Sequence, residues 1–264
     1  MPPTTPITDF FPRTTPASSS IAPGRRRVIS LFDHDGSALA PWAERKYECI
    51  SYQHSDNRRD WSDRSSGNTR RITCSITVEK LATIAHEHDG LVAFACANPP
   101  SNDLSIAGAR HWKRKRDNDP EFQTRWIDLI QAIDLTFTKW HCPFYISHPT
   151  KSILCKLWKP PNYHFQPFNY GGFIPKTESH RLYPDIVPRQ DAYTQQHALW
   201  TGGRFRLPDP RPVKPPWLTV RPKSKPHVMR RISPMLAWKA RHARRTTPQG
   251  FALALCRRLL GEAD

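Results

Sequence analysis

The chain has 264 residues, with 40 Lys and Arg against 23 Asp and Glu, which gives a formal net charge of +17. This length suits one large domain or two small ones, and the nine Trp and twelve Phe argue against a wholly disordered chain. No apolar run approaches the roughly 20 residues needed to span a bilayer, and none resembles the core of a signal peptide, so we expect a protein that neither spans a membrane nor is secreted. The charge favours a polyanionic partner, most simply nucleic acid.

The basic residues concentrate near the end of the chain, where residues 201–264 hold 15 Lys and Arg against three acids. The 27 prolines are about twice the usual share of ~5%, which predicts long irregular segments. The six cysteines form no CxxC pair and no Cys/His spacing suited to zinc, and the histidines are scattered. We therefore expect free intracellular thiols and no metal site.

Residues 1–27 are rich in Pro, Thr and Ser, and we expect a disordered leader there. Within it, Ile7, Phe10 and Phe11 can form one turn of helix whose apolar side chains project together into a partner's groove. This segment resembles the sliding-clamp (PCNA) interaction box, with Thr4 where that box usually has Gln. The alternative is a chance apolar cluster in a flexible tail. A real box would favour a nuclear location, and its absence the cytoplasm of a host cell.

From residue 27 onward, short apolar runs alternate with segments of helical periodicity. The firmest helix begins at Asp119, a good N-cap, has Pro120 in its first turn and ends before Pro143. Residues 156–235 interrupt the alternation and are predicted to be an irregular insert rich in Pro, Gly and aromatic residues, with short strands. A last helix is predicted over 247–261, capped by Thr247. The other predicted elements are strands at 27–32, 48–52, 71–75, 91–95 and 144–146, and helices at 38–46 and 77–88.

This alternation predicts an α/β domain over residues 28–264 with a mostly parallel, doubly wound sheet. Such sheets present ligands at the carboxyl ends of their strands. The first strand leads into a turn containing Phe32, Asp33, Asp35 and Gly36, where glycine allows close approach of a ligand. On its own this strand–turn–helix signal is weak.

A second candidate loop follows the predicted strand at 91–95. Asn98, Pro99, Pro100 and Ser101 form a rigid Pro-Pro loop of the kind that DNA base methyltransferases use to hold a flipped-out base. The segment downstream is basic with an aromatic residue inside it, which suits phosphate contact and stacking, the alternative being a solvated helix start. Its candidate DNA-binding residues are Arg110, His111, Lys113 and Lys115.

Several motifs follow one another in a fixed order along the chain. They are Leu31-Phe32-Asp33 with Gly36, Pro41-Trp42-Ala43-Glu44, Tyr47-Glu48-Cys49, Pro99-Pro100 with Asp103-Leu104-Ser105, Gly108-Ala109-Arg110, Trp158-Lys159-Pro160, Tyr170-Gly171-Gly172, Asp191-Ala192-Tyr193, Leu199-Trp200-Thr201-Gly202-Gly203, and Arg244 with Thr247-Pro248 and Gly250-Phe251-Ala252. This ordered set, over roughly residues 28–260, resembles the small, mostly phage-encoded DNA methyltransferases related to the cytosine-C5 enzymes.

The resemblance implies a Rossmann-like S-adenosylmethionine methyltransferase fold, a monomer and a DNA substrate. It also implies that the methyl donor S-adenosylmethionine contacts residues near both ends of the domain. These candidate cofactor-binding residues are Phe32, Asp33, Asp35, Gly36, Asp56, Thr247, Pro248 and Phe251.

The chain departs from this family at the positions that carry its chemistry. Ser101 aligns with the nucleophilic Cys, and Ser147 aligns with the Glu that contacts the cytosine ring. Cytosine C5 methylation needs a thiolate to add to the ring, and a serine hydroxyl is a much poorer nucleophile. Ser51 stands where the family has a ribose-binding acid, for which Asp56 is a possible substitute, and Cys74-Ser75 replaces a further acidic position.

Three interpretations follow. In the first, the protein is a DNA methyltransferase with altered chemistry, in which Asn98-Pro99-Pro100-Ser101 acts like the loop of amino-group methyltransferases; Ser101 stands where those enzymes usually have an aromatic residue. In the second, the fold survives as an inactive, DNA- and clamp-binding homologue. In the third, the chain is a basic interaction module without a base pocket.

The basic residues outside the base loop are interpreted as DNA contacts along a phosphate backbone, the alternative being a solvated tail. They are Arg204, Lys223, Lys225, Arg230, Arg231 and Arg244.

Overall fold

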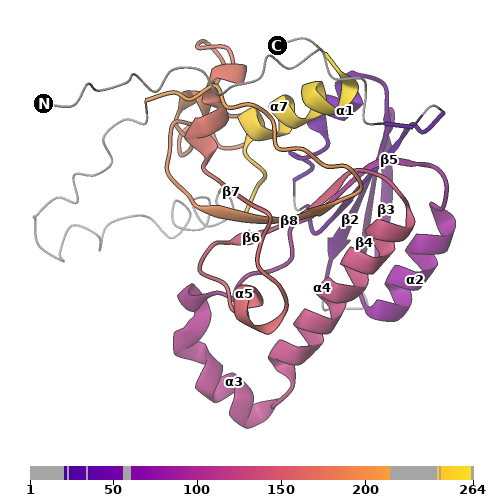
Figure 1. Cartoon of the computed structure of the whole chain (residues 1–264), viewed down its shortest axis with the longest axis vertical. Helices are drawn as coiled ribbons and strands as arrows, with labels where there is room; N and C mark the ends of the chain where they lie inside the picture. Colours follow the sequence, from indigo (N-terminus) through magenta and orange to yellow (C-terminus); the bar gives the residue numbers. More distant parts are fainter. Residues whose placement is uncertain are drawn as a thin grey trace, which may run out of the picture.

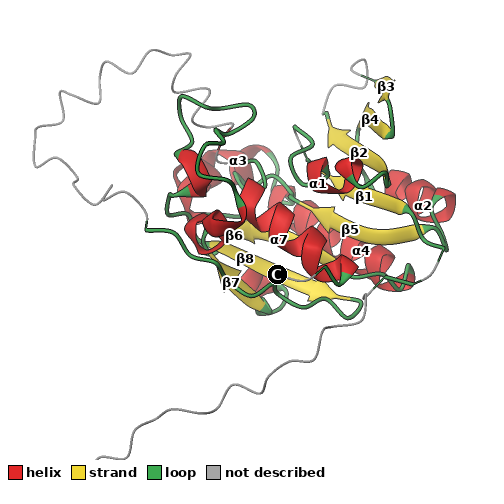
Figure 2. Cartoon of the chain, turned by 90° about the horizontal axis from the view of Figure 1, so that it is seen from above, coloured by secondary structure: helices red, strands yellow, loops and turns green. Residues whose placement is uncertain are grey.

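The computed structural model describes residues 21–22, 24–33, 35–55, 61–214, 243 and 245–262. Its centre is a mixed sheet of eight strands in the order β3-β4-β2-β1-β5-β6-β8-β7 (Figures 1 and 2). The strands are β1 (Arg27–Leu31), β2 (Glu48–His54), β3 (Ser62–Ser66), β4 (Thr69–Cys74), β5 (Val92–Ala97), β6 (Phe144–Pro149), β7 (Tyr163–Phe165) and β8 (His197–Gly202).

The predicted α/β class with a mostly parallel sheet is confirmed. Strands β4, β2, β1, β5 and β6 run parallel to one another, because each successive pair is joined by a parallel ladder. β3 joins one edge as an antiparallel partner of β4, and β8 pairs antiparallel with both β6 and β7. The central strands β1, β5 and β6 are buried along most of their length, as expected for a sheet covered on both faces.

Helices cover the two faces of the sheet and create two cores (Figure 2). On one face, α2 (Val78–Glu87) and α4 (Phe122–Lys139) pack their apolar sides on the sheet, with Ile130, Ile133 and Phe137 fully buried. On the other face, α1 (Ala40–Glu44) and α7 (Gln249–Leu260) pack together around Trp42 and Phe251. Two short helices, α3 (Trp112–Asn118) and α5 (Leu154–Leu157), lie at one end of the molecule (Figure 1).

Most predicted elements are present, and some boundaries differ for identifiable reasons. The predicted leader already makes contacts before β1, since the Arg25 guanidinium donates to the Val92 and Trp140 carbonyls. Asp119 does not cap α4; it ends α3 and pairs with Arg125, and α4 begins at Phe122. The strand β3 was not predicted, because its sequence is polar and it is held by backbone pairing at the edge of the sheet.

The predicted irregular insert does contain short strands in its described part, and one of them lies inside the central sheet. Its described part contains β7 and β8, and β8 sits inside the sheet between β6 and β7. Leu199 and Trp200 on β8 are fully buried. The remainder of that part consists of loops and the short 3-10 helices η3 (Pro167–Phe173) and η4 (Arg189–Asp191). No helix in the described ranges is long and apolar enough to cross a bilayer.

The start of α7 is fixed by Asp191, from a segment nearly 60 residues earlier. One carboxylate oxygen of Asp191 accepts the Gly250 N–H at 2.8 Å, so it satisfies a donor that a helix start leaves free. Burial raises the pKa of Asp191 to about 6, against the opposing effect of the Gly250 and Gln249 N–H groups. The prediction that Thr247 caps this helix is therefore wrong. The predicted end is confirmed, since Gly261 follows α7 in the left-handed conformation.

We expect Asp191→Ala to lower the free energy of unfolding by about 1–3 kcal/mol at pH 7, because it removes a cap and leaves a buried N–H unpaired. Urea unfolding followed by circular dichroism measures this. Asp185→Ala, at an exposed position in the same segment, is the matched control. Equal losses in the two variants would contradict this role of Asp191.

Candidate functional site

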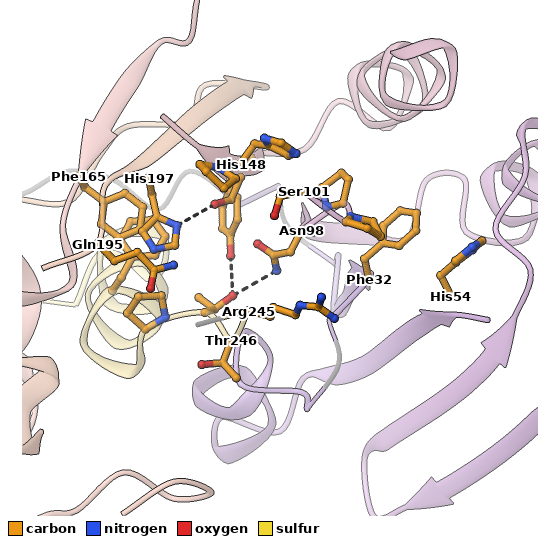
Figure 3. A pocket seen from close by; sticks show the side chains of 18 of the residues that line it. Phe32, His54, Asn98, Ser101, His148, Phe165, Gln195, His197, Arg245 and Thr246 are labelled. Atoms are coloured by element: carbon orange, nitrogen blue, oxygen red, sulfur yellow. Dashed lines mark hydrogen bonds between the residues drawn. The ribbon is translucent and has the colours of Figure 1, made fainter. Parts of the chain in front are cut away.

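A pocket of about 130 Å³ opens at the carboxyl edge of the parallel strands. β1 and β5 are neighbours in the sheet, but the chain leaves β1 in one direction, through β2 and β4, and returns to β5 on the other side. This topological switch point is where open α/β sheets bind ligands. Figure 3 shows the lining side chains. The lining residues are Phe32, Gln53, His54, Asn98, Pro99, Pro100, Ser101, Tyr145, Ser147, His148, Pro149, Phe165, Gln195, His197, Arg245, Thr246, Thr247, Pro248 and Phe251.

The Pro-Pro loop is held in place by the segment that precedes α5. Asn98 continues the sheet by donating its N–H to the Leu31 carbonyl, and the Ser101 carbonyl accepts the Ser105 N–H to close a turn. The loop is tight near Gly108, where an added Cβ would lie 1.7 Å from the Asn102 carbonyl oxygen. The Ile153 N–H and the Ser152 hydroxyl both donate to the Leu104 carbonyl, which ties the loop to residues 152–153. The Pro-Pro loop is therefore positioned by hydrogen bonds to the end of β1 and from residues 152–153, which follow β6.

Three polar side chains form a chain of hydrogen bonds across the pocket wall (Figure 3). The Asn98 amide nitrogen donates to the Thr247 hydroxyl at 3.3 Å, and the Tyr145 hydroxyl lies 3.4 Å from the same oxygen. This arrangement fixes the orientation of the Asn98 amide, whose carbonyl oxygen is left as an acceptor. Thr247 thus contributes to the site rather than to the helix cap.

The far end of the pocket holds two buried imidazoles. The Ser147 hydroxyl lies 3.4 Å from Nδ1 of His197, and Phe165 stacks on the His197 ring with centroids 4.8 Å apart. Nε2 of His197 has no hydrogen-bond partner among the described residues, and the carbonyls of Pro100 and Pro149 lie near the His148 ring. Burial lowers the pKa of both histidines to about 4, although the carbonyls of Pro100 and Pro149 near His148 partly favour its protonated form. Both imidazoles are neutral at pH 7.

The chemical groups of a cytosine-C5 enzyme are not found among the described lining residues, which include no Cys, Asp or Glu. Ser101 and Ser147 both line the pocket at the positions that the resemblance assigns to the nucleophile and the acid. The described chain also has no group of three or more His, Cys, Asp or Glu side chains placed to hold a metal ion.

The turn after β1 holds two neighbouring carboxyl groups, of which Asp33 is buried and Asp35 is half-buried. Asp33 is 1% exposed, and burial, followed by the nearby Asp35 carboxylate, raises its pKa well above the usual range. One side-chain oxygen of each of Asp33 and Asp35 has no partner among the described residues. Gly36 has φ +75°, and the Arg71 guanidinium donates to the Asp35 carbonyl behind it. Unpaired buried oxygens of this kind mark a place for a ligand or ordered water.

An aromatic cluster lies beside this turn, where the two strands β1 and β2 end. Phe32 has φ +62°, and its ring lies 5.6 Å from His54 and 6.1 Å from Trp126. A second, larger cavity lies against His54 and Trp126 and is lined by residues of α2, α3 and α4. Ser51, aligned with the ribose-binding acid, is buried and donates to the Asp33 carbonyl, so Gln53 and His54 occupy the exposed end of β2.

The structure brings most of the predicted catalytic and cofactor residues together. Asn98, Pro99, Pro100, Ser101, Ser147, Phe32, Thr247, Pro248 and Phe251 all line the pocket. Asp33, Asp35 and Gly36 form the adjoining turn described above. The predicted residues that lie outside the described ranges are Asp56, Lys223, Lys225, Arg230, Arg231, Arg244, Ile7, Phe10 and Phe11.

The predicted DNA-binding residues within the described ranges divide into two groups. Arg110, His111 and Lys113 are exposed on the 3-10 helix η2 (Ile106–His111) and α3, next to the Pro-Pro loop, while Lys115 is paired with Asp103. Arg204 does not belong with them. Because β8 is antiparallel to β6, Gly202 pairs with Phe144 at the start of β6, so Arg204 lies at the opposite edge of the sheet from the pocket.

Sequence reasoning missed the residues that come from the far end of the pocket, chiefly His148, His197 and Phe165. His148 directly follows Ser147, just after the predicted strand at 144–146, and this position was the signal that could have placed it in the pocket. His197 and Phe165 reach the pocket through the antiparallel pairing of β7 and β8.

Neither the models of known protein families nor the curated proteins give a match to this sequence. The functional conclusion therefore rests on the fold and on the geometry of the pocket.

We expect the buried imidazoles to make stability depend on pH. Their folded pKa lies below the unfolded value of about 6.5, so their contribution is complete above pH 6.5 and is lost as pH falls toward 4, by roughly 1 kcal/mol per pH unit for each imidazole. His148→Asn should reduce this slope in urea unfolding measured from pH 4.5 to 7.

Exposed His164→Asn is the control and should leave the slope as in the unmodified chain. Asp33 and Asp191, whose pKa values are raised, act in the opposite direction, but they cancel in the comparison of the two variants. The same slope in His148→Asn and the unmodified chain would contradict a buried, neutral His148.

Proposed function

We propose that this chain is an S-adenosylmethionine-dependent DNA methyltransferase-like protein that acts on an exocyclic amino group of a base. The observation that carries the proposal is the pocket at the topological switch point. It combines a rigid Pro99-Pro100 loop with an oriented Asn98 acceptor, and its described lining residues include no thiol and no carboxylate. Amino-group methylation requires neither of those groups, since the nitrogen can attack a methyl donor directly.

The fold supports the proposal. A parallel sheet that ends in an antiparallel pair, with one strand inserted between its neighbours, is the arrangement expected for the methyltransferase fold that the sequence resembles. The motifs behind the resemblance also meet in space. Tyr170-Gly171 packs against Gly250, and Asp191 bonds to the same residue, so three distant motifs converge on the start of α7.

The turn after β1 fits S-adenosylmethionine, which when bound would supply an electrophilic methyl group. The unpaired oxygens of Asp33 and Asp35 suit its ammonium or hydroxyl groups, and Gly36 keeps the turn open to close approach. The rings of Phe32, His54 and Trp126 suit a planar heterocycle such as adenine.

Asn98 would position the reacting amine. Because its amide nitrogen already donates to Thr247, its carbonyl oxygen is available to accept a hydrogen from an exocyclic NH₂ group. The amine would be held with its lone pair free, while Pro99 and Pro100 restrict where the base can lie.

The exposed basic residues that follow the Pro-Pro loop would hold the DNA backbone. Arg110, Lys113 and Arg114 are exposed on η2 and α3. The Ile106 N–H donates to the Lys151 carbonyl, so the exposed Lys151 lies beside η2. These charges lie where the strand around a flipped-out base would pass.

We expect Lys113→Ala to weaken DNA binding several-fold at low salt and to reduce the slope of log K against log salt by about one, because one phosphate contact is lost. Fluorescence anisotropy at several salt concentrations measures both quantities. Lys139→Ala, exposed at the far end of α4, is the matched control. If the two variants bind alike, α3 is not the DNA-binding surface.

We expect the purified protein to transfer labelled methyl groups from S-adenosylmethionine to DNA and to yield N4-methylcytosine or N6-methyladenine by mass spectrometry of the nucleosides. Asn98→Ala should lower the rate at least tenfold, because the amine loses its acceptor. Thr138→Ala, at an exposed site near the end of α4, should leave the rate unchanged.

Two results would overturn this assignment. No S-adenosylmethionine binding by calorimetry, with intact DNA binding, would indicate an inactive DNA-binding homologue. Formation of 5-methylcytosine only in the double variant Ser101→Cys with Ser147→Glu would indicate a C5 enzyme that has lost its catalytic groups.

A further inference from the structure

One charged side chain lines the pocket. Arg245 is the single Lys, Arg, Asp or Glu among the described lining residues, and it is exposed. Its guanidinium has no hydrogen-bond or ion-pair partner among the described residues, and the sequence holds no Asp or Glu between Asp209 and Glu262. Figure 3 shows the side chain extending from the wall that holds Thr246 toward the side that holds Phe32. An unpaired guanidinium in this position is suited to an oxyanion, which it can bind through two parallel hydrogen bonds.

The backbone around Arg245 is fixed against the turn after β1. The Thr246 N–H and the Thr246 hydroxyl both donate to the Ala243 carbonyl, at 3.4 Å and 2.8 Å, and close a turn that contains Arg245. The Thr247 N–H donates to the Ser37 hydroxyl at 3.1 Å. Arg245 is therefore held two residues away from a direct hydrogen bond to the turn after β1.

That turn presents carboxyl groups to the same corner of the pocket. Asp33 is 1% exposed, and one oxygen of each of the Asp33 and Asp35 side chains has no partner among the described residues. The other Asp35 oxygen accepts the Ser37 N–H at 3.0 Å, and Ser37 is the residue that is bonded to the segment of Arg245. Arg71 does not meet the need of these oxygens, because its guanidinium donates to the Asp35 carbonyl.

A guanidinium and carboxyl oxygens that flank one corner without pairing indicate a ligand with two kinds of polar group. Most buried polar groups in proteins are bonded, so the carboxyl oxygens call for a hydrogen-bond donor such as an ammonium group. A phosphate would match Arg245 but would leave the carboxyl oxygens without a donor. The end of a free α-amino acid matches both sides, because it carries a carboxylate and an ammonium group on one carbon.

We propose that Arg245 binds the carboxylate at the amino-acid end of S-adenosylmethionine, while the unpaired oxygens of Asp33 and Asp35 bind its ammonium group. The inference rests on the proposed function, and it adds a residue that none of the motifs behind the resemblance includes. Thr247, in the same segment, orients Asn98. The short segment before α7 would thus position both the methyl donor and the acceptor of the amine.

The test compares two ligands that differ only in this carboxylate, S-adenosylmethionine and its decarboxylated form. Isothermal titration calorimetry on the full chain measures both affinities without DNA and without methyl transfer. We expect Arg245→Gln to weaken binding of S-adenosylmethionine about tenfold or more and binding of the decarboxylated form less than about twofold, because only the first ligand loses a contact. Arg245→Lys keeps the charge but not the planar fork and should give an intermediate loss.

Arg204→Gln is the matched control, because Arg204 is exposed at the opposite edge of the sheet from the pocket. It should leave both affinities as in the unmodified chain. Near-UV circular dichroism checks the folding of each variant. The unmodified chain gives a measurement that needs no variant, since it should bind the decarboxylated form more weakly than S-adenosylmethionine by a similar factor.

The outcomes separate this inference from the proposed function. If the unmodified chain binds both ligands equally, or Arg245→Gln weakens both by the same factor, Arg245 does not bind the carboxylate, and the proposed cofactor binding stands. Unchanged affinities in Arg245→Gln would also overturn the inference, and weaker DNA binding by that variant in anisotropy would identify a phosphate as its ligand. If the unmodified chain binds DNA but neither ligand, the proposed methyl transfer fails and this inference fails with it.

Discussion

The bond between the Asp191 carboxylate and the Gly250 N–H holds the start of the last helix, α7, which packs on one face of the sheet. Gly250 is also packed closely against Tyr170, because an added Cβ on Gly250 would lie 2.3 Å from the Tyr170 carbonyl oxygen. Gln190 and Asp191 both have positive φ, a conformation that costs free energy outside glycine and that this capping bond helps to offset. Thr247, Pro248 and Phe251 become a wall of the pocket only because α7 begins there, so the site depends on a contact between segments far apart in the chain.

Much of the exposed positive charge near the pocket lies outside it, although Arg245 lines its wall. The exposed positive charge of η2 and α3 lies outside, where phosphates would be held, while the interior at His148 and His197 is neutral because burial disfavours the protonated rings. The buried Asp33 and the half-buried Asp35 lie together in the turn after β1, and the raised pKa of Asp33 limits the negative charge there. An uncharged base would enter such an interior without meeting an unpaired buried charge.

The parts of this fold that could be predicted are those that local sequence decides. The apolar spacing of α4, the buried run of β5, the Thr77 cap of α2 and the left-handed Gly261 are visible in the sequence and present in the structure. β3 was not predicted because its side chains are polar, with four of its five residues exposed. Short strands were expected in the Pro-rich region that contains β8, but not the bounds of β8 or its place inside the sheet. The Pro-Pro loop and Phe32 could be assigned to one site because parallel strands end at a common edge. His197 could not, since its position depends on a register between β6 and β8 across about 50 residues.

The residues around Ser101 and Ser147 decide which chemistry these two serines could support. Covalent chemistry on a cytosine ring needs a nucleophile and a proton donor, and His148 and His197, with pKa values of about 4, cannot supply the proton at pH 7. Under the proposed function, the chemistry in this pocket would begin from a neutral base, as transfer of a methyl group to an amine or as recognition alone. Both would need the same placement of the base against Asn98 and the Pro-Pro loop. The turn after β1 distinguishes the two. A bound methyl donor would give the unpaired oxygens of Asp33 and Asp35 hydrogen-bond partners, whereas without one these oxygens lower the stability of the fold.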